Sequence, residues 1–399
     1  MATTVDSGSH RAVPAAGNPL NRPEVRQVIY QVILMVALVA FFWIIIGNAI
    51  ENLRKQNVAA GFGFLDRTAG FDISQTLIDY SAQSTFRQAI LVGLVNTLVV
   101  SLIGIVVATA IGFVMDIARL SSNWLIARIA TAYVETARNI PLLLQLFVWY
   151  FAIAINLPPA NQSFVIPGGG FLNVRGLFLP KPVAEPGFSL VLVALAIGIA
   201  ASIGFAVHAR LLQQRTGKRL PVLWTTLGLA IGLPLALFLA LGRPLSFEYP
   251  ALRGFNFAGG LALQPEMFAM ILGLVFYTGG YIAEIVRAGI VGVSTGQKEA
   301  ARALGLPNGL MMRLVIIPQA LRIIIPPLTS QYLNLTKNSS LGIAIAYPDL
   351  THTLANTTLN QTNQAIETIG ILMGIYLTIS LLTSAFMNWF NRRVALVER

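Results

Sequence analysis

Apolar residues occur along the chain in long, almost uncharged runs rather than in the short alternations typical of soluble proteins. A helix needs about 20 apolar residues to cross the hydrocarbon core of a bilayer. The first run, Val28 to Ile46, contains one interior polar residue, Gln31, and no charge. We therefore predict an all-α, polytopic membrane protein with eight transmembrane helices, at about residues 28–50, 88–115, 130–155, 189–207, 221–241, 267–287, 310–333 and 366–390.

The seventh run differs from the others because prolines interrupt it. Proline lacks the backbone N–H that continues a helix, and inside a bilayer the freed carbonyl groups need other partners. We therefore expect a kinked or broken helix around Pro318, Pro326 and Pro327.

Small residues recur at every fourth position of the second and fourth runs. Such stripes let helix backbones approach closely in lipid, where packing drives association. We interpret them as packing faces rather than as the lining of a pore. Their members are Gly104, Ala108 and Gly112, and Ala194, Gly198, Ser202 and Ala206.

Composition agrees with a membrane protein and excludes several soluble classes. Only 11% of the residues are charged, against about 25% in a typical soluble domain. The chain has no cysteine and three scattered histidines, which argues against disulfides, a thiolate nucleophile and a metal centre.

The net charge of +11 is informative once the basic residues are assigned to sides of the membrane. Eight spans place both termini on the same side. If that side is the cytoplasm, its segments hold 18 lysines and arginines and the opposite face holds 8. This bias indicates a multi-pass protein with cytoplasmic termini, so the charge does not indicate binding to nucleic acid.

The spans and loops also describe the N-terminal part of the chain and one long loop. Residues 1–27 are expected to form a disordered cytoplasmic tail, and an anchor helix with a periplasmic loop (28–85) follows. Loop 156–188, which is rich in proline and glycine, is expected to lack regular structure.

One cytoplasmic loop predicts a short helix with marked ends. Ser294 and Gln297 have the spacing of a capping box, and Gly305 and Pro307 suit the end of a helix. About ten helical residues are roughly 15 Å long, too short to cross a bilayer. This helix would either transmit force from a soluble partner or lie on the membrane surface.

The same loop resembles the EAA loop of ABC importer permeases. The resemblance rests on Glu299-Ala300-Ala301, on Gly305, and on Val315-x-Ile317-Pro318. It implies that the loop is a coupling helix that docks in a groove of a cytoplasmic ATPase. The coupling residues that it implies are Gln297, Glu299, Ala300, Ala301, Gly305 and Pro318.

Three further segments resemble the polar amino-acid permeases within that family: 133–145, 277–290 and 337–350. The first departs from the family pattern at Asn139-Ile140, where glycine-threonine is usual, and the third has Asp349 where glutamate is usual. The extended layout is most similar to the long permease subunit of general L-amino-acid importers. An importer restricted to acidic amino acids and their amides is the near alternative.

This resemblance implies a type I ABC importer permease fold in the bacterial inner membrane, with two extra helices inserted in a five-helix core. The first part of the core would be residues 86–155, the insert with its two transmembrane helices residues 156–254, and the second part of the core residues 255–399. It also implies import of L-amino acids by alternating access. The partners would be a cytoplasmic ABC ATPase dimer, a second and different permease subunit, and a periplasmic amino-acid-binding protein.

Charged and polar residues in or beside the spans are candidates for a gate or substrate path. Glu135 with Arg138, and Glu284 with Arg287, are three residues apart and could equally form local ion pairs. A polar segment of the seventh run could meet a zwitterionic substrate, or serve helix packing or a subunit contact. It comprises Asn334, Lys337, Asn338, Ser339 and Ser340.

The sequence predicts no enzymatic activity for this chain. Gly217-Lys218 is followed by Arg219, so the phosphate-binding loop pattern fails, and no catalytic residue is proposed. We expect no cofactor here, with ATP and Mg²⁺ used by the partner ATPase. An ion-coupled secondary transporter is the alternative from another class, but its typical internal repeats are not evident.

Overall fold

The computed structural model describes residues 23–55, 61–218 and 220–394. Within these ranges seven helices are long and apolar enough to cross a membrane, and an eighth candidate is a bent pair. The fold is therefore the predicted polytopic helical one. The seven are Val25–Asn48, Phe86–Arg119, Phe188–Thr216, Val222–Ala240, Pro265–Val291, Asn308–Ile345 and Ala365–Arg393.

The predicted span 130–155 is not one straight helix. Helix α3 (Trp124–Asn139) ends, and α4 (Leu142–Phe147) with its short continuation to Asn156 leaves at an angle of 111°. Pro141 disfavours a helical residue before it, and Ile140 is accordingly extended (φ −99°, ψ 128°). The buried Gln145 amide donates to the Ala137 and Ile140 carbonyl groups at 2.9 and 2.8 Å. The break is thus compensated by a side chain.

Of the kink or break expected in the seventh run, the break is wrong. A short helix α10 (Asn308–Met311) and a π-helical turn (Met312–Ile316) lead directly into α11 (Ile317–Asn338), which continues through both internal prolines. Pro318 follows the π-helical turn, and Ile317 before it is itself in the α conformation, so the helical backbone continues through this proline as well. A 3₁₀ segment (Ser339–Ile345) follows.

Helix α8 (Pro265–Val291) is the centre of the bundle, and packs against α2 (Phe86–Arg119), α3, α4 and α11. Its close contacts depend on small residues. A Cβ atom added at Gly280 would lie 2.5 Å from the Ala137 Cβ atom of α3, and one added at Gly112 of α2 would lie 2.5 Å from Ile282 of α8. The stripe in the second run is thus a packing face, as predicted.

The inserted helices form a hairpin that packs mainly on itself. Helix α5 (Phe188–Thr216) runs against α6 (Val222–Leu227), a π turn (Gly228–Gly232) and α7 (Leu233–Ala240). The stripe of the fourth run lies at this contact, since Gly198 faces the Leu229 backbone and the Ser202 hydroxyl donates to the Thr226 carbonyl at 3.1 Å. This stripe, too, is a packing face.

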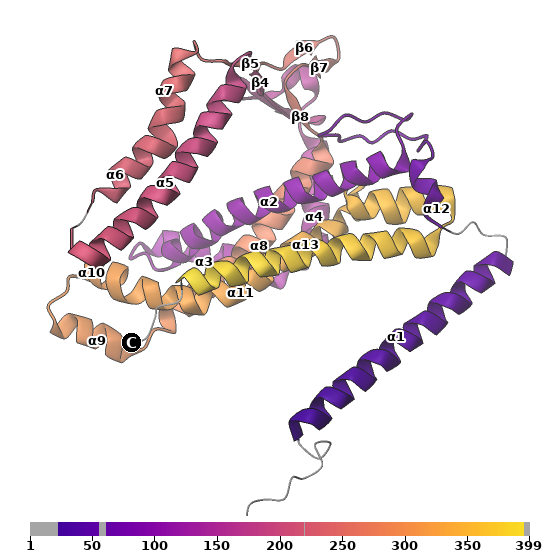
Figure 1. The fold of residues 1–399 in the computed structure, drawn as a ribbon. Coiled ribbons are helices and arrows are strands. Elements are labelled where there is room, and N and C mark those ends of the chain that lie inside the picture. The colour runs from indigo at the N-terminus through magenta and orange to yellow at the C-terminus, as the bar shows by residue number, and fades with distance from the viewer. Residues whose placement is uncertain (1–22, 56–60, 219, 395–399) are drawn as a thin grey trace, which may run out of the picture.

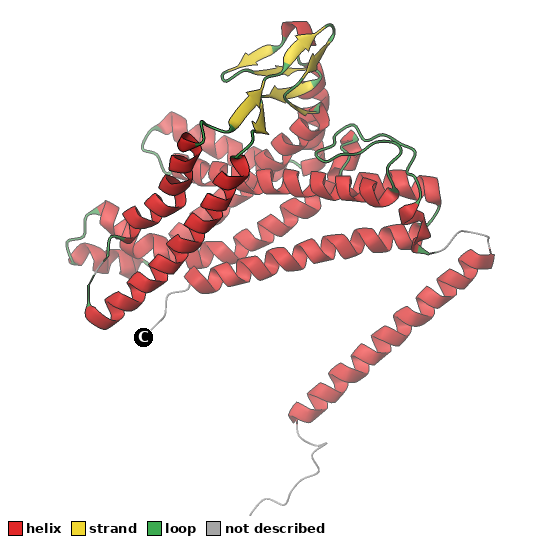
Figure 2. Cartoon of the chain, turned by 45° about the horizontal axis from the view of Figure 1, so that its top comes forward, coloured by secondary structure: helices red, strands yellow, loops and turns green. Residues whose placement is uncertain are grey.

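Short strands occupy the loops on both sides of this hairpin, contrary to the expectation that loop 156–188 lacks regular structure. Four of them form an antiparallel sheet in the order β1-β2-β3-β8, in which Leu177 pairs with Leu263. Figure 2 shows that the strands gather in one small cap. They are β1 (Phe164–Ile166), β2 (Gly170–Asn173), β3 (Gly176–Leu179), β4 (Lys181–Ala184), β5 (Leu245–Glu248), β6 (Ala251–Arg253), β7 (Asn256–Ala258) and β8 (Leu261–Leu263).

The cap and the predicted coupling helix lie at opposite ends of the molecule (Figure 1). Helix α9 (Thr295–Ala303) lies at the end where α5 turns into α6. Helix α13 (Ala365–Val394) runs along the bundle, and α1 (Pro23–Lys55) lies apart from it. Residues 1–22 of the expected disordered tail fall outside the described residues.

Candidate coupling and translocation site

Hydrogen bonds cap the C-terminus of helix α9, whereas no side chain caps its N-terminus. Gly305 has φ +70°, and the N–H groups of Gly305 and Leu306 donate to the carbonyl groups of Arg302 and Ala301 at 2.9 and 3.1 Å. This is the Schellman arrangement, which glycine favours. The capping box is absent, because the Ser294 side chain caps no N–H group.

One face of α9 is fixed to the bundle. Ala301 is 3% exposed and belongs to the main apolar core together with Met311 and Ile316. The Gln319 amide of α11 donates to the Gln297 side-chain oxygen at 3.2 Å. A displacement of α9 would therefore be passed to the start of α11.

The opposite face of α9 is open. Glu299, Ala300 and Ala303 are exposed, and Leu304 is 80% exposed at the helix tip. Ala300, Ala303 and Leu304 are three and four residues apart, so they share a helix face that points away from the chain's own core.

Glu284 joins three helices through arginines at the α9 end of the bundle. Its carboxylate accepts from Arg119 of α2 at 2.9 Å and from the Arg287 Nε of its own helix at 2.9 Å. Arg138 of α3 lies 3.4 Å away. Because the Glu284 side chain is 22% exposed, these interactions are only partly screened by water.

The predicted pairs therefore have different outcomes. Glu284 and Arg287 pair as expected for residues three apart. Arg138 pairs with Glu284 and lies over the Tyr281 ring at 5.7 Å rather than pairing with Glu135. Glu135 is exposed and has no ion pair with any described residue.

Asp116, one turn before Arg119, was not among the predicted site residues. It is fully buried, and neither carboxylate oxygen has a hydrogen-bond partner in the described part of the chain. It borders a largely apolar cavity of about 550 Å³ between α2, α8 and α11. Arg119 is close to Asp116 along the same helix, whereas only the fold brings Arg287 of α8 near it.

The polar segment of α11 divides between buried and exposed positions. Ser339 is fully buried, and its hydroxyl donates to the Thr336 carbonyl at 2.8 Å. Ser340 likewise bonds the Lys337 carbonyl at 2.7 Å. The side chains of Asn334 and Lys337 are exposed on α11, whereas Asn338 is half-buried. The two serines therefore complete the helix end, and the exposed pair is free to meet a partner or a substrate.

A buried polar cluster at the opposite end was missed by sequence reasoning. Asn96 of α2 donates to the carbonyl groups of Gln75 and Pro348 at 2.8 and 2.9 Å. The hydroxyl of Tyr347 donates to the Asn96 carbonyl at 3.1 Å. This cluster fixes α2 to the segment after α11.

Asp349 in that segment is a helix cap. Its carboxylate accepts from the His352 N–H at 2.7 Å at the start of a helix that includes a π-helical stretch (His352–Thr358). Burial raises the pKa of this carboxyl to about 6, and the hydrogen bond from the His352 N–H partly opposes this rise.

No cluster of three or more histidine and acidic residues that could hold a metal ion occurs in the described ranges.

Comparisons with known proteins agree with this geometry. The family model "Binding-protein-dependent transport system inner membrane component" matches residues 108–396. The chain is 51% identical, over 94% of both chains, to the general L-amino acid transport system permease protein AapQ of Rhizobium johnstonii.

Two further relatives have similar lengths. The chain is 48% identical to the putative amino-acid ABC transporter permease protein YhdX of Escherichia coli, over 98% of this chain and all of that one. It is 40% identical, over 92% and 93%, to the glutamate/glutamine/aspartate/asparagine transport system permease protein BztB of Rhodobacter capsulatus. The chain therefore belongs to the family of inner membrane components of binding-protein-dependent transport systems, among its amino-acid ABC transporter permeases.

Proposed function

We propose that this chain carries L-amino acids inward across the bacterial inner membrane, with both termini in the cytoplasm, and that α9 couples it to a separate ATPase. The observation that carries this proposal is the construction of α9. Ala301 holds the helix to the core, while Glu299, Ala300 and Leu304 are left open for a partner.

The mechanism follows from these contacts. Closure of the partner ATPase around ATP and Mg²⁺ would move α9, and the link from Gln297 to Gln319 would pass this movement to α11. Because α11 packs on α8 and α8 on α2, the helices would switch together towards the outward-facing state. This chain would bind no cofactor of its own.

The Glu284 cluster would hold one state of this cycle. Arg119, Arg138 and Arg287 converge on a single carboxylate from three helices. Separating α2 or α3 from α8 would break part of this network, so its formation and loss can distinguish two arrangements of the bundle.

A second, different permease subunit would complete the path. The exposed side chains of Asn334 and Lys337 lie on α11 without a hydrogen bond to any described residue. We assign this surface to the contact with the second subunit or to the cavity between them. The relatives' names support amino acids as the substrate class, either a broad set or acidic amino acids and their amides.

Uptake into proteoliposomes tests this proposal. The chain is reconstituted with its ATPase, second permease and binding protein, and labelled L-amino acid is followed with and without ATP. We expect ATP-dependent uptake that Glu299→Lys reduces, whereas Asp79→Lys, an exposed charge reversal at the other end, does not. Uptake driven by an ion gradient without ATP would contradict the proposal.

A further inference from the structure

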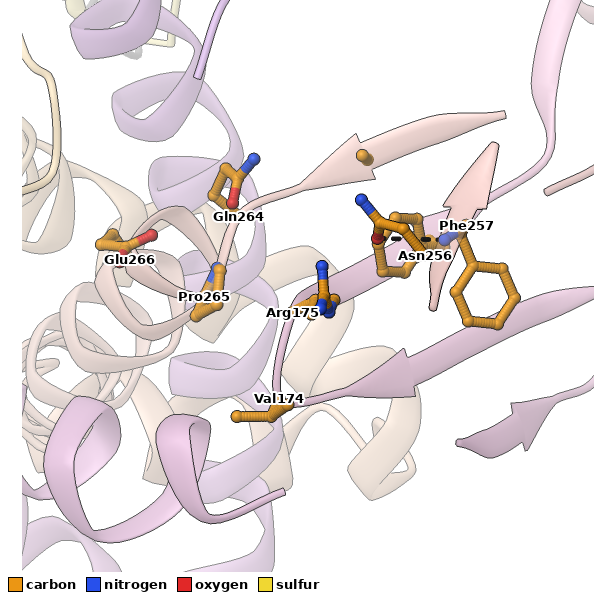
Figure 3. A pocket seen from close by; sticks show the side chains of 9 residues that line it. Val174, Arg175, Asn256, Phe257, Gln264, Pro265 and Glu266 are labelled. Atoms are coloured by element: carbon orange, nitrogen blue, oxygen red, sulfur yellow. Dashed lines mark hydrogen bonds between the residues drawn. The ribbon is translucent and has the colours of Figure 1, made fainter. Parts of the chain in front are cut away.

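A cavity of about 470 Å³ lies between the strand cap and the start of α8. Its volume falls within the usual range for small-molecule sites. Figure 3 shows that its walls come from the turn between β2 and β3, from β7, and from the first residues of α8. The cavity thus connects the insert to the central helix of the bundle.

The two charged side chains of the cavity have opposite sign and come from different elements. Arg175 belongs to the turn between β2 and β3, and Glu266 to the first turn of α8. Figure 3 shows both among the side chains around the cavity. A neutral cavity with a separate cation and anion is suited to a ligand that itself carries both charges.

Hydrogen bonds fix the backbone at Arg175. Asn173 is fully buried, and its side-chain oxygen accepts from the Arg175 N–H at 2.8 Å. The Asn173 amide in turn donates to the Ser163 hydroxyl at 2.9 Å. The guanidinium group has no hydrogen bond or ion pair with any described residue, so its donors remain available.

A hydrogen bond also positions Glu266, and it occupies only one of the two carboxylate oxygens. One carboxylate oxygen accepts from the Tyr150 hydroxyl at 2.8 Å. The second oxygen has no hydrogen-bond partner within the described ranges. A carboxylate in the first turn of α8 is also stabilised by the positive end of the helix.

The remaining walls combine apolar side chains with two amides, those of Asn256 and Gln264. The rings of Phe178 and Phe257 stack with centroids 4.8 Å apart, and Val174 and Pro265 line the cavity beside them. The apolar part of the wall accepts side chains of different size with little discrimination.

From this arrangement we propose that the cavity is a binding site for a free L-amino acid. The guanidinium of Arg175 would receive the α-carboxylate through paired hydrogen bonds. The carboxylate of Glu266 would receive the α-ammonium group, and the amino-acid side chain would lie against the aromatic rings. The inference rests on the proposed function, whose orientation places this cavity on the outer face, ahead of the path through the membrane.

Direct binding to the permease complex tests this site. The complex is placed in nanodiscs without binding protein, and binding of labelled L-glutamine is compared with that of its methyl ester and of N-acetyl-L-glutamine. We expect Arg175→Gln and Glu266→Gln each to weaken L-glutamine binding at least about tenfold. Arg175→Gln should also remove discrimination against the methyl ester, and Glu266→Gln that against the acetylated compound.

Arg253→Gln is the matched control, because Arg253 is an exposed arginine of β6 that does not line this cavity. Unchanged L-glutamine binding by both cavity variants would contradict the proposed binding site but not the proposed function. The same holds if the unaltered complex takes up amino acids but binds no L-glutamine in this assay. A weakened affinity for the binding protein, with unchanged binding of free L-glutamine, would also overturn it. Binding without any ATP-driven uptake would instead contradict the proposed function.

Discussion

Replacing Glu284 with glutamine perturbs the point where α2, α3 and α8 are joined by charge. The substitution keeps the shape of the side chain but leaves Arg119, Arg138 and Arg287 without their common carboxylate. Removing one partner of a buried ion pair costs about 3–5 kcal/mol. Because Glu284 is 22% exposed and Arg119 19%, we expect a smaller loss of unfolding free energy, about 2–3 kcal/mol.

The assay is a double-mutant cycle read by mixed-micelle denaturation. Glu284→Gln, Arg119→Gln and the double variant should give a coupling free energy of about 1–2 kcal/mol. The control is the pair Asp66 and Arg87, which is as short, at 2.7 Å, but 72% and 62% exposed. That pair should couple by less than about 1 kcal/mol. Equal coupling in the two pairs would refute the reasoning from burial.

Three further substitutions test the packing, the buried polar cluster and the acidic cap. Gly280→Leu should abolish folded protein in size-exclusion chromatography, because even a Cβ atom there lies 2.5 Å from that of Ala137; normal yield would contradict the close packing of α3 on α8. Asn96→Ala leaves two buried carbonyl groups without their hydrogen-bond donor. It should lower the unfolding free energy by about 2–4 kcal/mol in the same denaturation assay. The Asp349 carboxyl, with pKa about 6 in the fold against about 3.9 unfolded, binds its proton more tightly when folded. Stability should therefore fall by about 2–3 kcal/mol as pH rises from 4 to above 6, and Asp349→Asn should remove this slope; an unchanged slope would contradict the assignment.

The features predictable from sequence are those set by local interactions. Apolar runs are sufficient to place seven of the spans, and Gly305 with Pro307 marks the end of α9 because the Schellman arrangement depends on neighbouring residues. The Glu284–Arg287 pair was equally local, since residues three apart share a helix face.

The features that were missed depend on contacts between distant segments. The third Glu284 partner, Arg119, is 165 residues away in the chain. Strand β3 finds its partner β8 only after the whole helical hairpin, so strands of three or four residues left no periodic signal. Asn96 looked like one polar residue in an apolar run, and only its hydrogen bonds to the carbonyl groups of Gln75 and Pro348 give it a role. The break at Pro141 differs from these features, because the proline itself is a local signal. The apolar residues on both sides of it nevertheless predicted one continuous span.

The central claim, that α9 faces the cytoplasm and couples to the ATPase, is tested most directly by thiol labelling. The chain has no cysteine, so Leu304→Cys introduces a single thiol at an 80% exposed position, and Phe255→Cys introduces one in the cap at a 91% exposed position. Both variants are treated with a membrane-impermeant maleimide in right-side-out and inside-out vesicles, with and without ATPase. The account predicts that Leu304→Cys is labelled only in inside-out vesicles and is protected by the ATPase, whereas Phe255→Cys is labelled only in right-side-out vesicles and is indifferent to it. Labelling of both positions from the same side, or of Leu304→Cys equally with and without ATPase, would contradict the account.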